Sequence, residues 1–289
     1  MKMTKYALAA VVAFSASSVA IADGHGNKKA TDTSPAEDLA AYRAYFEKRH
    51  PDDGAGGKPD FSNGVYSILA DARSQWENTE EFPPYEDMVA AGEEMWNTPF
   101  KNGKSYADCF GGDPAQRKNY PMWDDKRKMV VTMELAVNEC REANGEKPLK
   151  YKKGDMTRLT AYMAYESRGQ QVNVQIPNDD ALAAYNNGKE LYFGRRGQLN
   201  FSCASCHVQS SGTRVRGDTL SMGLGHGTGW PVYRQKWGDL GTLHRRLGGC
   251  MKQMRAKPFK AQGEELRNME YFLTHMSNGM EFNGPSSRK

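Results

Sequence analysis

Hydrophobic residues recur at helical spacing along most of the chain, whereas the alternating patterns typical of strands are scarce. One helical pattern starts at the capping box Ser34-Pro35-Ala36-Glu37, which has proline at the first helical position. This helix places Leu39, Tyr42 and Phe46 on one face, and the glycine-rich segment 50–60 ends it as a linker. Further helices are predicted at 156–166, at 264–274 and after a cap at Asn178 or Asp179. The pattern predicts a mainly α-helical protein.

The apolar run from Tyr6 to Phe14 has a different character. It follows Lys2 and Lys5 and leads to small residues ending at Ala22, which predicts a secretory signal peptide at 1–22. In a bacterium, such a signal places the mature protein in the periplasm. No later run approaches the roughly 20 apolar residues of a spanning helix, so we expect no membrane span.

The overall charge does not point to a nucleic-acid partner. Loss of residues 1–22 removes two lysines and no acid, which lowers the formal net charge from +4 to +2. This value is too small to predict nucleic-acid binding.

Two of the five cysteines lie in Cys203-Ala204-Ser205-Cys206-His207, the attachment pattern of c-type haem. Two thiols at this spacing can add to the two vinyl groups of haem, and the adjacent histidine can bind the iron as its proximal ligand. An exported chain is where this covalent attachment is expected. The alternatives are a chance motif or a small metal site.

The chain also contains an internal repeat, in which residues 90–111 match residues 185–208. In the first copy, Tyr106 and Phe110 stand where the second copy has Cys203 and His207. The first copy therefore has the outline of a haem site without the first thiol or the histidine. The aligned pairs are Gly92 with Gly188, Trp96 with Tyr192, Ser105 with Ser202, and Cys109 with Cys206.

The repeat continues to the two closing helices and assigns the remaining cysteines. The distance from Pro121 to Cys140 is 19 residues, as is the distance from Pro231 to Cys250. Because this segment supplies the sixth iron ligand in c-type cytochromes, Cys250 takes the distal-ligand position. The alternatives for Cys250 are a buried apolar residue or an intermolecular disulfide.

Cys140 occupies the equivalent place in the first copy, where it can form a disulfide with Cys109. The alternative is two separate buried thiols. Other candidates for the distal position are histidine or methionine side chains, namely His226, His244, His275, Met222, Met251, Met254 and Met276.

A basic segment surrounds Cys250. Residues 214–260 hold ten lysines and arginines against two acids, which would attract a small dianion or an acidic partner surface. If residues 241–250 are helical, Arg246 lies one turn before Cys250 on the same face, and Arg245 or Arg255 could assist it. A guanidinium can bind a sulfonate through two parallel hydrogen bonds. The less specific interpretation is a solvated face or a docking patch for a redox partner.

With these residues identified, the sequence resembles the SoxA family, the A subunits of the sulfur-oxidising (Sox) system. These are c-type cytochromes with L-cysteine S-thiosulfotransferase activity. The resemblance spans nearly all of the mature chain, and its most specific motifs are "SCASCH", "YADCFGG", "LAVNECR" and "RRLGGCMKQMR". Tyr106 and Phe110 depart from members with two haems, so the chain is similar to the single-haem form.

The resemblance implies one covalently attached haem c (heme c), held by Cys203, Cys206 and His207, with Cys250 as distal ligand and persulfide-bearing catalytic residue. It implies that Arg246 contacts substrate. It further implies a heterodimer with a small c-type cytochrome (SoxX) and a carrier protein (SoxY with SoxZ). Thiosulfate would be conjugated oxidatively to a carrier cysteine, with two electrons passing to cytochrome c.

Two other functions remain open at this point. One is an electron-transfer c-type cytochrome in which Cys250 is incidental, and the other is a thiosulfate dehydrogenase that forms tetrathionate. For the fold, we expect two tandem cytochrome c-like domains, of which only the C-terminal one binds haem. The predicted division is a signal peptide at 1–22, an N-terminal arm at 23–77, a haem-less domain at 78–170 and a haem domain at 171–289.

Overall fold

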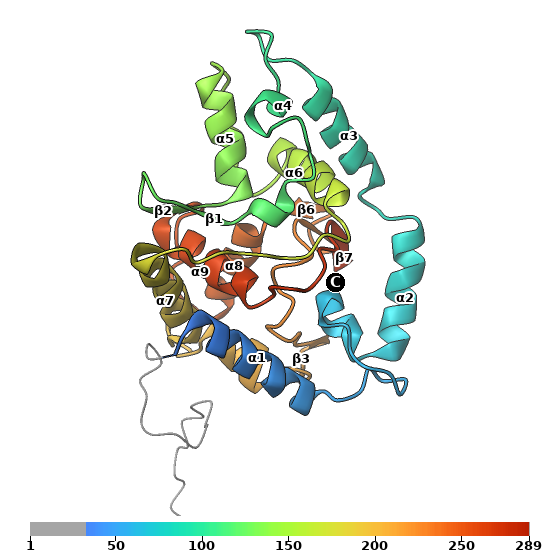
Figure 1. The fold of residues 1–289 in the computed structure, drawn as a ribbon. Helices are drawn as coiled ribbons and strands as arrows, with labels where there is room; N and C mark the ends of the chain where they lie inside the picture. Colours follow the sequence, from blue (N-terminus) through green and yellow to red (C-terminus); the bar gives the residue numbers. More distant parts are fainter. Residues whose placement is uncertain (1–32, 289) are drawn as a thin grey trace, which may run out of the picture. The chain divides into compact units, whose positions relative to one another are not determined.

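Helices form most of the regular structure in the computed structural model, which describes residues 33–288 (Figure 1). The predicted helices at 156–166 and 264–274 are α6 and α9, and the predicted signal peptide lies outside the described residues. The helices are α1 (Pro35–Arg49), α2 (Ala70–Glu81), α3 (Glu86–Asn97), α4 (Tyr106–Cys109), α5 (Met133–Ala143), α6 (Asp155–Glu166), α7 (Asp179–Phe193), α8 (Leu243–Gln253) and α9 (Glu264–His275). Two 3₁₀ segments, η1 (Phe61–Ser67) and η2 (Arg117–Asn119), and one π-helical turn, η3 (Ser205–Gln209), complete the set.

Strands are short, as the sequence indicates, and none within residues 33–288 exceeds three residues. They form an antiparallel β1–β2 hairpin, an antiparallel β3–β4 hairpin and a three-stranded sheet in the order β6-β5-β7, in which β7 runs parallel to β5. The strands are β1 (Met122–Asp124), β2 (Met129–Val131), β3 (Arg214–Val215), β4 (Asp218–Thr219), β5 (Val232–Arg234), β6 (Asp239–Gly241) and β7 (Ser286–Arg288). The sequence pattern did not predict these hairpins.

The internal repeat reappears as a repeated order of elements. In the first copy, α3, α4, β1, β2, α5 and α6 follow one another, and in the second copy α7, η3, β5, β6, α8 and α9 do so. Thr132 and Thr242, which occupy equivalent positions in the two copies, cap equivalent helices. Thr132 accepts a hydrogen bond from Leu135 N at the start of α5, and Thr242 accepts one from Arg245 N at the start of α8. The second copy has additional residues after His207, and the β3–β4 hairpin, which has no counterpart in the first copy, lies in them.

A glycine at the crossing of the first and last helix of each copy explains the match of Gly92 with Gly188. A Cβ on Gly92 of α3 would lie 2.1 Å from the carbonyl oxygen of Arg158 in α6. A Cβ on Gly188 of α7 would lie 2.0 Å from the carbonyl oxygen of Asn268 in α9. Both helix pairs therefore approach so closely that only glycine fits at the contact.

The segment before the first copy packs against the second copy. Tyr42 and Phe46 of α1 are buried, and the Tyr42 and Tyr192 hydroxyls are 3.2 Å apart. Asp38 accepts a hydrogen bond from Lys189 Nζ at 2.7 Å. The capping box at Ser34 is confirmed, and segment 50–60, the predicted linker, contains no helix or strand. The N-terminal arm thus contributes to the core around α7 and α9.

A buried charged cluster, which we define as Arg117, Glu134, His244 and Glu270, joins the two copies. Glu270 of α9 lies 3.2 Å from His244 Nε2 and 3.8 Å from Arg117 Nη1. Burial, and then the negative charge of Glu270, raise the pKa of Glu134. Burial alone would raise the pKa of Glu270 too, but the hydrogen bond and charge of His244 and the charge of Arg117 lower it. The same cluster therefore shifts the pKa values of these two carboxyl groups in opposite directions.

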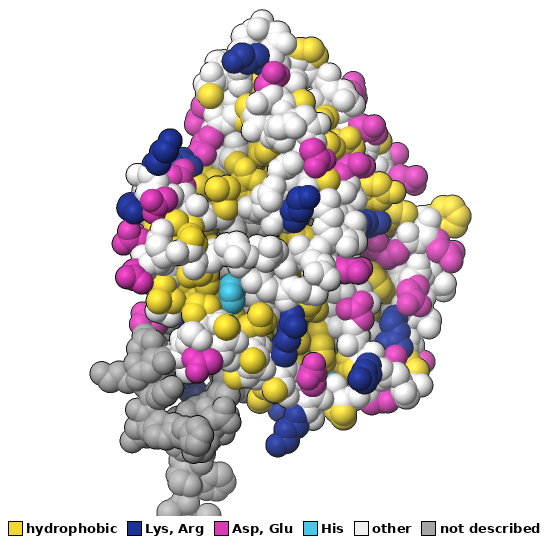
Figure 2. Space-filling view, viewed as in Figure 1, with side chains coloured by type: hydrophobic (Ala, Val, Ile, Leu, Met, Phe, Trp, Pro, Cys, Tyr) yellow, Lys and Arg dark blue, Asp and Glu magenta, His cyan; other side chains and the backbone are white. Residues whose placement is uncertain are grey.

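On the face shown in Figure 2, acidic and basic side chains are interspersed, with hydrophobic side chains visible between them. This mixed surface agrees with the small net charge of the chain.

Candidate functional site: a haem-attachment motif beside a free cysteine

The attachment motif follows α7, which Asn178 caps by accepting a hydrogen bond from Ala181 N. Ser202 and Ser205 cap the short helical segment reciprocally: Ser205 N donates to Ser202 Oγ at 3.0 Å, and Ser202 N donates to Ser205 Oγ at 3.1 Å. Cys203 and Cys206 are partly buried and are not joined to each other in a disulfide. Both thiols are therefore available for thioether bonds.

The environment of His207 suits a proximal iron ligand. Its Nδ1 lies 2.9 Å from the carbonyl oxygen of Ser221, so that Nδ1–H donates and Nε2 keeps a free lone pair. Burial lowers the pKa of His207 to about 4, and the positive charge of Arg246 acts in the same direction. The imidazole is thus neutral at neutral pH, which is the form that binds iron.

Cys250 lies on α8, within electrostatic reach of both thiols of the attachment motif. Burial, and then the negative charge of Cys250, raise the pKa of Cys203 to about 12, and the same causes raise the pKa of Cys206. Cys250 itself is a free, partly buried cysteine. The structure thus brings the fifth cysteine to the motif across more than 40 residues of sequence.

Gly248 and Gly249, which precede Cys250, leave space on the helix. A Cβ on Gly249 would meet no atom within 4 Å, and one on the buried Gly248 would meet only Pro258 Cβ at 3.8 Å. This room beside three free thiols and a neutral imidazole fits a bulky planar group such as haem.

Arg246 is the basic residue that the sequence predicts at this site. Residues 243–253 form α8, so Arg246 lies one turn before Cys250. Burial lowers the pKa values of His207 and His226, and the charge of Arg246 acts in the same direction. At Cys206, the charge of Arg246 opposes the larger raising effects of burial and of Cys250. Arg245 instead donates a hydrogen bond to Leu240 O at 3.0 Å, and Arg255 lies exposed beyond the end of α8.

Each alternative histidine contacts other groups in this structure. His226 stacks edge-on against His207, with ring centroids 4.5 Å apart, and its Nε2 lies 3.0 Å from Ser221 Oγ. Both ring nitrogens of His244 are engaged, Nδ1 by Gln262 N at 3.2 Å and Nε2 by Leu266 O at 3.1 Å. His275 packs against Tyr185, with ring centroids 5.2 Å apart.

The alternative methionines belong to the hydrophobic core around α7 and α9. The four are Met222, Met251, Met254 and Met276, each at most 6% exposed. Met251 Sδ accepts a hydrogen bond from Phe259 N at 3.5 Å. Methionine packing of this kind needs no metal to explain it.

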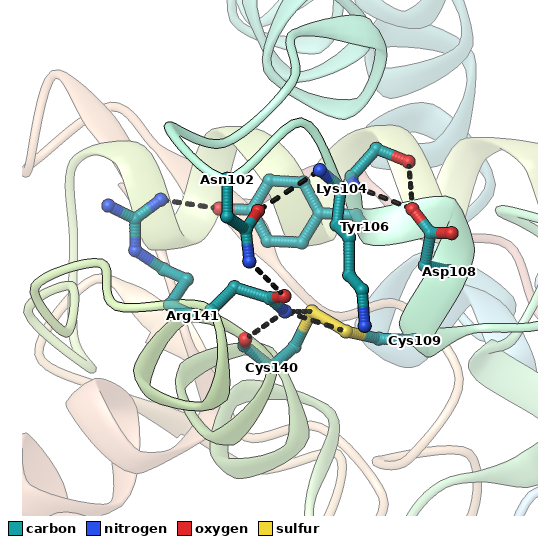
Figure 3. Close-up of a disulfide and its surroundings, with 9 residues drawn as sticks. Asn102, Lys104, Tyr106, Asp108, Cys109, Cys140 and Arg141 are labelled. Carbon is teal, nitrogen blue, oxygen red and sulfur yellow. Dashed lines mark hydrogen bonds between the residues drawn. A yellow bond between two sulfur atoms is a disulfide. The ribbon is translucent and has the colours of Figure 1, made fainter.

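The matching position in the first copy is closed by a disulfide. Cys109 and Cys140 are bonded at 2.05 Å, which confirms the predicted pair, and Asn144 Nδ2 points toward both sulfurs (Figure 3). Tyr106 and Phe110 are buried among aromatic rings, and a cavity of about 250 Å³ remains beside the disulfide. Arg141 Nη1 donates to Tyr106 Oη at 2.7 Å, so the ring is fixed where the second copy has its first thiol.

Comparison with known proteins identifies the family. A model described as the SoxA/TsdA cytochrome c domain matches residues 91–172 and 187–282, the two copies of the repeat. The L-cysteine S-thiosulfotransferase subunit SoxA of Allochromatium vinosum is 56% identical over 261 residues, which cover 90% of this chain and 92% of the relative. The chain belongs to the SoxA family of L-cysteine S-thiosulfotransferase subunits. This result confirms the predicted family and enzyme class.

Two further comparisons agree. The SoxA subunit of Chlorobaculum tepidum is 51% identical over 252 residues, covering 87% of each chain. The crystal structure of SoxXA from P. pantotrophus matches with a TM-score of 0.69 and 31% identity, covering 75% of this chain and 84% of that chain. The fold is thus a mainly helical cytochrome c fold in two segments, and the cytochrome c domain implies haem c as cofactor.

The structure also bears on the predicted absence of a membrane span. Within residues 33–288, every helix is too short or too polar to cross a bilayer.

Proposed function

We propose that this SoxA-family chain carries one haem c, attached to its second copy only. Cys203 and Cys206 would form the thioethers, and His207 and Cys250 would bind the iron as proximal and distal ligands. The observation that carries this proposal is the free Cys250 on α8, one helical turn after Arg246 and within electrostatic reach of both thiols of the attachment motif. In the first copy, the disulfide occupies the matching cysteines and aromatic rings replace the missing thiol and histidine.

The proposed reaction joins thiosulfate to a cysteine of a carrier protein. A sulfur–sulfur bond forms between the carrier cysteine and the outer sulfur of thiosulfate, the carrier thiol loses its proton to water, and two electrons leave to two molecules of oxidised cytochrome c. When bound, haem supplies the one-electron redox chemistry. The sulfur of Cys250, which we infer is carried as a persulfide, forms the transient bond to the outer sulfur before exchange to the carrier thiolate.

The residues of this chain have distinct tasks in that reaction. Arg246 offers a planar guanidinium to the sulfonate oxygens. Ser221 O fixes the Nδ1–H tautomer of His207. The glycines before Cys250 leave the thiol accessible.

The comparisons support one of the proposed partners. The matched crystal structure is of a SoxXA complex, which supports a heterodimer of this chain with a small c-type cytochrome, SoxX. A carrier protein of the SoxY and SoxZ type would present the acceptor cysteine. The signal peptide expected at residues 1–22 supports a periplasmic location for the reaction.

Thiosulfate dehydrogenase remains the second candidate because the matching family model also covers TsdA cytochromes. The two reactions are separated by assaying the heterodimer with thiosulfate and oxidised cytochrome c, with and without carrier. We expect cytochrome reduction and a carrier mass increase of one thiosulfate group only when carrier is present, and neither with Cys250→Ala. Tetrathionate formed at full rate without carrier would overturn the proposed function.

A further inference from the structure

A second arginine, Arg234 of β5, lies near Cys250 and has no anionic partner. Its Nε is buried and makes no hydrogen bond. Neither Arg234 nor Arg246 takes part in an ion pair within residues 33–288. A partly buried guanidinium without a counter-charge is costly, which suggests that an anion completes the site.

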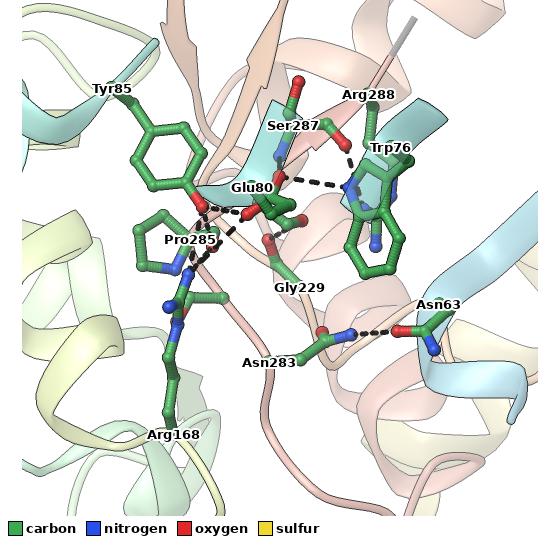
Figure 4. Close-up of polar contacts among 12 residues, drawn as sticks. Asn63, Trp76, Glu80, Tyr85, Arg168, Gly229, Asn283, Pro285, Ser287 and Arg288 are labelled. Atoms are coloured by element: carbon green, nitrogen blue, oxygen red, sulfur yellow. Dashed lines mark hydrogen bonds and ion pairs between the residues drawn. The ribbon is translucent and has the colours of Figure 1, made fainter. Parts of the chain in front are cut away.

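The strand that carries Arg234 is held on both sides. Arg234 is paired with Asp239 of β6 and with Arg288 of β7, because β5 is the central strand of the three-stranded sheet. Figure 4 shows how β7 is anchored: Ser287 N donates to Glu80 Oε1 at 2.6 Å, and Arg168 Nη2 donates to Pro285 O at 2.6 Å. A side chain on such a strand is positioned before any ligand arrives.

Arg234 is within electrostatic reach of Arg246, and Arg245, the neighbour of Arg246 on α8, lies over the same Trp237 ring as Arg234. Burial, and then the positive charge of Arg246, lower the pKa of Arg234, whereas the negative charges of Asp218 and Cys250 act in the opposite direction. The cross-strand neighbour Asp239 does not neutralise Arg234, because its Oδ1 accepts the hydrogen bond of Leu240 N at 2.8 Å. Two guanidinium groups thus repel each other beside the reactive sulfur, and an oxyanion between them would relieve that repulsion.

The neighbouring arginine shows a different arrangement. Arg245 donates to Leu240 O and lies 4.2 Å from the ring centroid of Trp237, so its guanidinium is already engaged. The guanidinium of Arg234 also lies over the Trp237 ring, 5.5 Å from its centroid, and Arg234 Nε makes no hydrogen bond. Of the two arginines on Trp237, Arg234 is the one with a buried donor that makes no hydrogen bond.

We propose that Arg234 and Arg246 together bind the sulfonate end of thiosulfate and aim its outer sulfur at Cys250. This inference rests on the proposed function and adds Arg234 as the second arm of the oxyanion site. Two planar guanidinium groups can contact all three sulfonate oxygens, whereas one can hold only two. The ligand class is a tetrahedral sulfur oxyanion, and plain sulfate should compete for the same two side chains.

The test uses the intact heterodimer with Arg234→Gln, Arg234→Lys, Arg246→Gln and the exposed control Arg255→Gln. Loss of one charge-assisted contact should raise the KM for thiosulfate and the inhibition constant of sulfate roughly 10- to 100-fold in Arg234→Gln. Arg234→Lys should recover part of this loss, and Arg255→Gln should stay within about threefold of wild type because it lacks the contact. The low-spin EPR signal should be unchanged in all four variants, which reports an intact iron site.

Each result has a definite meaning. A KM and a sulfate inhibition constant unchanged in Arg234→Gln but raised in Arg246→Gln would overturn this inference and leave the proposed function standing. Equal effects of Arg234→Gln and Arg255→Gln would also overturn it, since they would show only general attraction of anions. Wild-type kinetics in both Arg234→Gln and Arg246→Gln would instead count against thiosulfate as the substrate of this site.

Discussion

The disulfide in the first copy should be a large contributor to stability and should have no part in the chemistry. The bond between Cys109 and Cys140 closes a loop with a sequence separation of 31 residues. The loop-closure entropy removed from the unfolded chain by a cross-link of this length corresponds to about 3.7 kcal/mol at 25 °C. For a chain of this size, such a loss corresponds to a fall in melting temperature of about 7–15 °C.

The assay compares thermal unfolding of wild type, Cys109→Ser and the double variant Cys109→Ser with Cys140→Ser, each with and without a phosphine reductant. Thioethers resist such reductants, so the disulfide is the cross-link that should respond in wild type. We expect the reduced wild type and both variants to melt at similar, lowered temperatures with unchanged haem absorption. Turnover is compared without reductant, because a phosphine would also remove the outer sulfur of a persulfide on Cys250, and both variants should match wild type. A fall of less than about 2 °C would refute the entropic reasoning, and a loss of haem signal would show that these cysteines serve an iron site.

Two further predictions concern packing and buried charge. Glu134→Gln should raise the melting temperature, and the gain should grow from pH 5 to pH 8. Because the pKa of Glu134 is raised in the folded state, the folded protein keeps a proton that the unfolded chain releases. Wild-type stability therefore falls as pH rises through that window. Parallel pH profiles of the two proteins would contradict this assignment. Gly188→Ala places a Cβ 2.0 Å from Asn268 O and should cost about 1–3 kcal/mol or more in urea unfolding, whereas Gly217→Ala, whose Cβ meets no atom within 4 Å, should cost less than about 1 kcal/mol. Equal costs would show that the α7–α9 crossing can relax.

Much of the site could be predicted because its signals are local or repeated. The spacing of Cys203, Cys206 and His207 is a chemical requirement of haem attachment, and the repeat carried the assignment on to Cys250 and to the Cys109–Cys140 pair. The disulfide is confirmed, and so is the helix that aligns Arg246 with Cys250. The iron ligands and the division into domains stay predictions.

Other features depend on contacts between distant segments, which a single sequence does not encode in any local pattern. Arg234 lies in a strand of three residues whose hairpin shows no strong alternation, so the sequence marked it only as one of the ten basic residues of segment 214–260. The buried charged cluster joins Arg117 and Glu134 of one copy to His244 and Glu270 of the other. His244 looked like a candidate iron ligand because of its closeness in sequence to Cys250, and only the fold showed its partners.

The central claim is that Cys250 binds the iron and is the reactive sulfur. Low-temperature EPR of the oxidised heterodimer, comparing wild type with Cys250→Ala, tests it most directly. The account predicts a low-spin ferric signal with the narrow spread of g values typical of histidine and thiolate ligation, which the variant loses. A broad signal of the histidine–methionine or bis-histidine kind, unchanged in Cys250→Ala, would contradict the claim and leave an electron-transfer cytochrome with an incidental cysteine.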